Sequence, residues 1–222
     1  CFTMKEGSIG DPDLYLGAKL RKTRLLNGVE AWTTSPAKYV VEAVKNVESY
    51  LAKEYDGRKL KKKAGAPFIS GYRPELDLSP VLDSTQAQYY QSLMGVLQWM
   101  VELGRIDMIT EVNIMASYVA MPREGHLDNI FHMFAYLKIK YNSRMVFDPS
   151  YPKIDMTSFK ECEWKHFYKG AKEAIPENAP EPRGKDVDLR CFVDADHAGD
   201  TVTRRSRTGF FIFINMAPVI FH

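Results

Sequence analysis

Apolar residues recur at three- and four-residue spacing in several long stretches, which is the pattern of a helix with one buried face. The first stretch covers residues 36–55, where Ser35 and Pro36 have the residue types of an N-cap and a first helical position. Residues 84–101, 108–119 and 127–141 repeat the pattern, separated by short joints. The spacing therefore predicts one long amphipathic helix followed by a compact three-helix layer, whose methionine and aromatic residues form its core.

Strand patterns flank these helices. Residues 14–22 and 29–33 surround Asn27-Gly28, a dipeptide that suits a tight turn, and together they predict a β-hairpin. Residues 144–147 predict a short strand. Near the end of the chain, residues 187–193 and 209–214 predict two further strands, and a turn at 215–218 leads into the start of another.

Between the helices and the last strands, residues 160–186 become rich in Lys, Glu, Pro and Gly, a composition typical of a linker. We therefore divide the chain into a first domain at 1–160, a linker at 161–186 and a second domain at 187–222. The first residue is Cys1 and the last residues lie within a strand pair, so we expect a piece of a longer protein with a truncated second domain. The fold class predicted is α+β.

Composition narrows the class of protein. With 45% hydrophobic and 26% charged residues, the 222-residue chain is not disordered throughout. A net charge of +2 excludes a uniformly basic protein. No apolar stretch reaches the length of a membrane helix, so no membrane contact is expected. Three widely spaced cysteines give no disulfide framework and suggest a reducing compartment.

Positive charge is concentrated near the N-terminus, because residues 1–63 carry a net charge of +5 and the remainder −3. The cations beside the predicted hairpin, and a run at 58–63, are candidates for contact with a nucleic-acid backbone, although solvated charge explains both equally simply. The hairpin cations are Lys19, Arg21, Lys22 and Arg24.

Residues 194–200 hold three carboxylates and a histidine at the end of a predicted strand. A strand can fix a carboxylate ligand for Mg²⁺ while the following loop admits substrate, and Asp194 and Asp196 share a face if the strand continues. A solvated acidic turn explains the same residues. Cys162 and His166 have the spacing of a helical metal-ligand pair, but no second pair accompanies them.

The order of segments along nearly the whole chain resembles a copia-type LTR retrotransposon Pol polyprotein, from reverse transcriptase into ribonuclease H. The motifs that carry this resemblance are Phe2-Thr-Met-Lys5, Leu14-Tyr-Leu-Gly17, Tyr90-Gln-Ser-Leu-Met-Gly95, Gly104-Arg-Ile-Asp107, Ser117-Tyr-Val-Ala-Met-Pro122, Glu124-Gly-His126, Ala135-Tyr-Leu-Lys138, Asp194-Ala-Asp-His-Ala-Gly-Asp200 and Arg204-Arg-Ser-Arg-Thr-Gly209. Ile106 stands where the family usually has Pro, and His197 where it usually has Trp. The family's Tyr-x-Asp-Asp polymerase motif and later ribonuclease H carboxylates are not in this sequence.

The resemblance implies an RNA-directed DNA polymerase with ribonuclease H in the parent protein, which serves DNA integration. For this chain it implies the thumb and connection region, which positions RNA/DNA hybrid or primer-template, followed by the opening strands of a ribonuclease H-like domain. Asp194 matches the first catalytic carboxylate and would be a ligand of Mg²⁺ in the complete enzyme. Because most of the carboxylates are missing, whether this chain is an enzyme stays open.

The same resemblance implies that the chain binds the rest of the Pol polyprotein and is intracellular, in a cytoplasmic virus-like particle with a nuclear phase. Two alternatives stay open: a non-catalytic helical module that binds a protein partner, and a degenerate retroelement relic. Salt-dependent binding of nucleic acid would separate the first reading from the alternatives.

Overall fold

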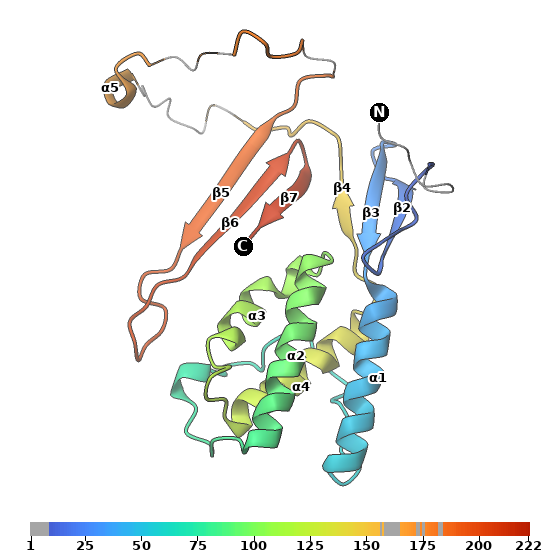
Figure 1. The fold of residues 1–222 in the computed structure, drawn as a ribbon, viewed down its shortest axis with the longest axis vertical. Helices are drawn as coiled ribbons and strands as arrows, with labels where there is room; N and C mark the ends of the chain where they lie inside the picture. The colour runs from blue at the N-terminus through green and yellow to red at the C-terminus, as the bar shows by residue number, and fades with distance from the viewer. Residues whose placement is uncertain (1–8, 156, 158–164, 172–173, 175, 182–183) are drawn as a thin grey trace.

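The computed structural model describes residues 9–155, 157, 165–171, 174, 176–181 and 184–222. It is a mixed α+β structure in which a helical layer carries two antiparallel sheets (Figure 1). The predicted fold class is confirmed at this level. In the part of the chain that is described, no helix is both long enough and apolar enough to cross a membrane.

The first sheet has the strand order β1-β2-β3-β4. Its strands are β1 (Leu14–Tyr15), β2 (Ala18–Arg24), β3 (Glu30–Ser35) and β4 (Met145–Phe147). The predicted hairpin is confirmed as β2 and β3, closed by a hydrogen bond from the Leu25 N–H to the Val29 carbonyl at 2.8 Å. The prediction of one strand over residues 14–22 is wrong, because a turn at Leu16-Gly17 divides it into β1 and β2. The predicted short strand is confirmed as β4, which pairs with β3.

Helix α1 (Ala37–Glu54) matches the first amphipathic stretch. Ser35 is not its N-cap: it is the last residue of β3, and its hydroxyl donates to the Ser143 carbonyl at 3.1 Å. No side chain caps α1 at this end. Its apolar face, which includes Val44 and Leu51, is buried in the same core as the later helices. The helical layer therefore contains four helices, α1 to α4, rather than the three expected.

The three-helix layer is confirmed as α2 (Ser84–Glu102), α3 (Ile109–Ala116) and α4 (Glu124–Ile139), with a 3₁₀ turn, η2 (Ile106–Met108), before α3. Asp83 caps α2, since its carboxylate accepts the Gln86 N–H at 2.8 Å. Helix α4 has buried residues on every turn and lies against α1 and α2. It is the centre of the core.

The segment between α1 and α2 wraps over α4 rather than extending into solvent. It includes η1 (Pro74–Leu76), and it buries apolar side chains such as Leu60 and Ala64. The Ile69 N–H donates to the buried Asn129 side chain at 3.2 Å. This segment therefore has a fixed path along the helical layer.

The second sheet has the order β5-β6-β7, formed by β5 (Leu189–Ala195), β6 (Thr208–Ile214) and β7 (Ala217–Phe221). All three predicted late strands are present. Buried Asn215, in the β6–β7 turn, accepts the Asp188 N–H at 2.9 Å and donates to the Pro149 carbonyl at 2.9 Å. This side chain ties the second sheet to the chain just after β4.

The predicted linker includes a short helix, α5 (Lys165–Tyr168). Cys162 of the predicted metal-ligand pair lies outside the described residues.

The two faces of the second sheet differ. Phe221 lies on the face that packs against the helical core. On the other face, Leu189, Val193 and Ile220 are each more than half exposed. This outer apolar face is open in the described structure.

Candidate nucleic-acid interface and carboxylate cleft

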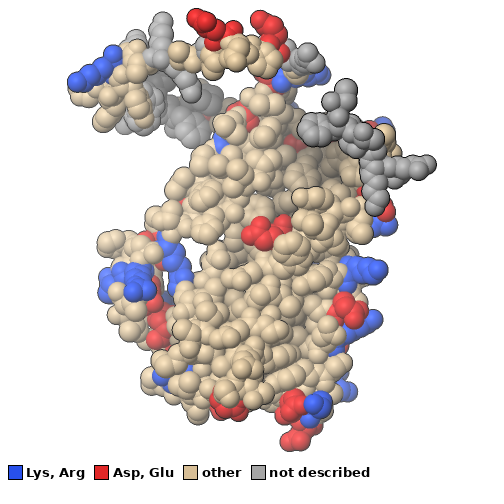
Figure 2. All heavy atoms as spheres, in the orientation of Figure 1, with Lys and Arg blue, Asp and Glu red and all other residues tan. Residues whose placement is uncertain are grey.

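Asp194 lies near the end of β5, opposite Gly209 of β6, and lines a cleft of about 510 Å³. One wall of the cleft is the β5–β6 loop, and the other is formed by residues 68–75 with α3. Asp196 lines the same cleft, as expected if the two carboxylates share a face. Figure 2 shows acidic and basic side chains gathered on the loop, at the left of the view.

The three carboxylates of residues 194–200 are held differently. Asp196 accepts the backbone N–H of Arg207, which closes the base of the loop. Asp200 accepts the N–H groups of Val202 at 2.9 Å and Thr203 at 2.7 Å, and these hydrogen bonds lower the pKa of Asp200. The Asp194 carboxylate makes no hydrogen bond or ion pair with any described residue, although its backbone is part of the β5–β6 pairing.

Asp196 and Asp200 therefore stabilise the loop itself through hydrogen bonds to its backbone. In the described part of the chain, no three His, Cys, Asp or Glu side chains are placed to hold a metal ion together. Of the three carboxylates, that of Asp194, on β5, is the one with both oxygens free to bind a ligand.

The opposite wall of the cleft contributes residues that the sequence did not point to. The Arg73 guanidinium lies 3.3 Å from the Glu75 carboxylate, which also accepts the Thr201 hydroxyl at 3.2 Å. The Arg207 guanidinium donates to the Ser117 hydroxyl at 3.4 Å. The contacts of Thr201 and Arg207 join the β5–β6 loop to the helical layer across 126 and 90 residues of sequence, so no local pattern could have revealed them.

The four predicted cations of the hairpin all lie on β2, but on two faces. Lys19 and Arg21 point to one side and Lys22 and Arg24 to the other, because side chains alternate along a strand. Lys19 is 3.8 Å from Asp13. Lys22 is 2.8 Å from Asp11, a hydrogen bond that raises the pKa of Lys22, and it lies over the Trp32 ring.

Arg21 and Arg24 are exposed, and neither forms an ion pair within the described structure. They are the hairpin cations that can bind an external anion without first breaking an internal pair.

A second group of cations follows α1. Arg58 is engaged, since it is 2.8 Å from Asp128 and its guanidinium lies over the Phe131 ring. Buried Leu60 anchors the segment. The side chains of Lys59, Lys61, Lys62 and Lys63 are exposed and form no ion pair with the residues described. Because α1 has 18 residues, the two cation groups lie at the two ends of a helix roughly 27 Å long.

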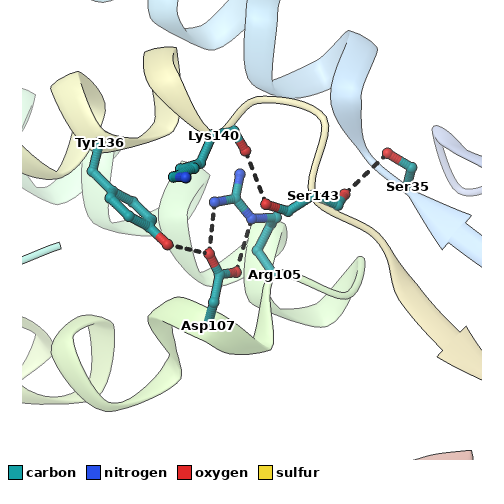
Figure 3. Close-up of polar contacts among 6 residues, drawn as sticks. All are labelled: Ser35, Arg105, Asp107, Tyr136, Lys140 and Ser143. Atoms are coloured by element: carbon teal, nitrogen blue, oxygen red, sulfur yellow. Dashed lines mark hydrogen bonds and ion pairs between the residues drawn. The ribbon is translucent and has the colours of Figure 1, made fainter. Parts of the chain in front are cut away.

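One motif of the resemblance, Gly104-Arg-Ile-Asp107, forms a polar cluster at the edge of the core, in which Arg105 is buried and Asp107 is exposed (Figure 3). Fully buried Arg105 donates two hydrogen bonds to the Asp107 carboxylate, at 2.9 and 2.8 Å, and the Tyr136 hydroxyl donates a third at 2.9 Å. Burial raises the pKa of Asp107, but the hydrogen bonds and charge of Arg105 outweigh it and hold that pKa below its usual range. The motif joins α2, α3 and α4, so its role is structural.

A second motif, Glu124-Gly-His126, is also explained by packing. The buried His126 ring accepts the Arg123 N–H at 3.1 Å through Nδ1, and its Nε2 lies 3.1 Å from the Pro74 carbonyl. The Gly125 N–H donates to the Ser79 hydroxyl at 2.9 Å. This start of α4 therefore holds the 74–79 segment, whose first two residues, Pro74 and Glu75, belong to one wall of the cleft.

Comparisons of the chain with models of known protein families, with curated proteins and with solved structures find no match.

Proposed function

We propose that this chain is the part of a copia-type reverse transcriptase that follows the polymerase active site, holds the primer-template and leads into ribonuclease H. The observation that carries the proposal is the unpaired Asp194 carboxylate on the first of three antiparallel strands, where it lines a cleft. A carboxylate fixed by a strand and open to a cleft is suited to nucleic-acid cleavage chemistry in the complete enzyme. The β5-β6-β7 sheet is the opening of the ribonuclease H-like domain.

In this proposal, the chain itself binds the phosphate backbone of the primer-template. Arg21 and Arg24 at one end of α1, and the lysines of residues 59–63 at the other, are placed to neutralise phosphates along a duplex. Each neutralised phosphate releases a counterion, so such binding is strong at low salt and carries no base specificity.

The residues present do not make a complete Mg²⁺ site. Mg²⁺ prefers octahedral oxygen coordination, and Asp194 supplies one free carboxylate while Asp196 and Asp200 are engaged with backbone N–H groups. The contribution of this chain to cleavage is the placement of Asp194.

The test is the salt dependence of binding to an RNA/DNA hybrid, measured by fluorescence anisotropy. For the wild type, log K should fall linearly with log salt. Replacing Arg21 and Arg24 by Gln should reduce the slope by about 1 to 2, because each lost phosphate contact reduces it by about 1 and the two side chains lie on opposite faces of β2. Replacing Lys19 and Lys22 by Gln should reduce it less, since those amines are already paired with Asp13 and Asp11.

A matched control neutralises Lys53 and Lys138, which are paired with Glu54 and Glu48. This double variant should keep the wild-type slope. Hybrid binding that does not vary with salt, or no detectable binding by the wild type, would contradict the proposed function.

One observation favours the alternative of a protein-binding helical module. A mainly apolar groove of about 220 Å³ lies between α1 and α2, lined by residues that include Tyr39, Ala43 and Val96. If the alternative is right, binding should be to a protein, should be insensitive to salt, and should be lost when Ala43 is replaced by Glu. A relic would show neither kind of binding.

A further inference from the structure

We infer that Arg73 and Arg207, from opposite walls of the Asp194 cleft, hold the phosphodiester backbone of a nucleic-acid strand across that carboxylate. The inference rests on the proposed function and adds a path for the strand and two positioning residues to it. Arg73 precedes η1 in the helical layer, whereas Arg207 ends the β5–β6 loop.

Arg73 has most of its hydrogen-bonding capacity free. Its guanidinium makes one ion pair, at 3.3 Å, with the Glu75 carboxylate, and 57% of its side chain is exposed. A guanidinium has five N–H donors and a planar shape that matches two oxygens of a phosphate. Arg73 can therefore keep Glu75 as a partner and still donate into the cleft.

Arg207 is placed rigidly on the facing wall. Its backbone N–H donates to the Asp196 carboxylate, and its carbonyl accepts the Asp196 N–H at 3.0 Å. The guanidinium has a long hydrogen bond to Ser117, at 3.4 Å, and forms no ion pair within the described structure. A fixed backbone with a largely unpaired guanidinium is suited to bind an anion.

The cleft also continues along α3, which gives it the length that an extended nucleic-acid strand requires. A second hollow of about 370 Å³ lies between α3 and β6, and it shares Thr110, Arg207 and Gly209 with the first. The two hollows form one trough that runs along α3 and past Asp194. A trough with a guanidinium on each side fits an extended polyanion better than a compact one.

The two guanidinium groups share the trough with four carboxylates, those of Glu75, Asp194, Asp196 and Asp200, so binding of a phosphodiester there depends on both arginines. Asp196 and Asp200 accept loop N–H groups, and Glu75 accepts Arg73 and the Thr201 hydroxyl. The Asp194 carboxylate makes no such contact, and it lies between the wall that carries Arg73 and the wall that carries Arg207. A phosphodiester held by Arg73 and Arg207 would thus be brought to this one carboxylate.

The experiment measures RNA/DNA hybrid binding against salt for the full chain with Arg73→Gln, Arg207→Gln and Arg205→Gln. Arg205 is the matched control, because it lies on the same loop, is exposed and does not line the trough. We expect Arg73→Gln and Arg207→Gln each to reduce the salt slope by about 1 and to raise Kd roughly tenfold, with Arg205→Gln close to wild type. Thermal melting of each variant confirms that it is folded.

Three outcomes would overturn the inference. If Arg73→Gln and Arg207→Gln keep the wild-type slope while Arg21 and Arg24 variants reduce it, the trough is not the path of the strand, but the proposed function stands. If Arg205→Gln weakens binding as much as Arg207→Gln, the effect is the general charge of the loop. If wild-type protein binds no hybrid, the proposed function fails first and the inference with it.

Discussion

His126 is held as a neutral ring by its two neighbours. Because Nδ1 accepts the Arg123 N–H, the proton must be on Nε2, which donates to the Pro74 carbonyl. Protonation of Nδ1 would remove the first hydrogen bond. Burial is the main reason that the pKa of His126 is lowered from 6.5.

The lowered pKa predicts how stability depends on pH. The unfolded state takes up a proton near pH 6.5, whereas the folded state resists protonation, so the stabilisation is complete above that pH and is lost as the pH falls below it. Urea unfolding of the wild type from pH 8 to pH 5 should show this loss, and His126→Gln should reduce it. Half-buried His132 also has a lowered pKa and contributes to the loss, so the control is His197→Gln, at an exposed position. Equal pH dependence in the wild type and His126→Gln would contradict the prediction.

Single residues also mark a limit of prediction from sequence. Arg105 belongs to a residue type that is almost never fully buried, so its place inside the helical layer could not be expected. It is buried because Asp107 and Tyr136 lie within reach, and Tyr136 comes from a different helix. Asp194, in contrast, was recognisable, because a carboxylate at the end of an apolar strand is visible in the sequence itself.

Helices α2 and α4 each contain a glycine, and the two have different surroundings. A Cβ on Gly95, within α2, would meet nothing within 4 Å. A Cβ on Gly125, in the first turn of α4, would lie 1.9 Å from the Asp77 carboxylate. That carboxylate is held by Tyr72 at 2.7 Å and by the Ser79 N–H at 2.8 Å, so it has little freedom to move away.

Alanine substitutions should therefore have opposite effects at these two glycines. Gly125→Ala should lower the free energy of unfolding by about 1–3 kcal/mol, as overpacking does. Gly95→Ala should raise it by roughly 0.5–1 kcal/mol, because alanine loses less conformational entropy in a helix. Chemical denaturation of both variants measures the two effects. A destabilising Gly95→Ala or a neutral Gly125→Ala would contradict the open surroundings of Gly95 or the close approach of Asp77 to Gly125.

Whole helices and strands were predictable because their periodicity is local, and the long helices begin and end close to the predicted residues. The failures occur where tertiary contacts decide. Leu16 has a φ of 50°, which is uncommon for a leucine, so Gly17, with a φ of 94°, is the one residue of the turn between β1 and β2 that suits it. The path of the segment between α1 and α2 was equally hidden, since it is set by contacts with α4 such as that of Ile69 with Asn129.

For the molecule as a whole, the proposed function predicts unequal roles for the loop carboxylates. In a longer polyprotein that contains the remaining ribonuclease H carboxylates, Asp194→Asn should abolish cleavage of the RNA strand and leave polymerisation largely intact. Asp196→Asn is the control, because its amide oxygen can still accept the Arg207 N–H and keep the loop closed. Gel assays of hybrid cleavage and primer extension measure both activities. A polyprotein that still cleaves RNA with Asp194→Asn would refute the role of this residue.

The candidate site as a whole was only half predictable. Its loop was recognised from residues 194–200, but the wall with Arg73 and Glu75 was not, because it approaches Asp194 only after the helical layer has formed. The β2 cations were found by composition, while their division into paired and unpaired members depends on Asp11 and Asp13, which nothing in the sequence assigned to them.

The pairing of β3 with β4 has a consequence for the order of folding. Thr34 pairs with Met145, so these two strands enclose the entire helical layer between them in the sequence. Closing so long a loop is entropically costly while the intervening chain is unstructured, but the cost falls once the helices have brought its ends together. The β2–β3 hairpin and the helices, whose contacts are more local, can therefore form first, and β4 completes the sheet as a late step that depends on both.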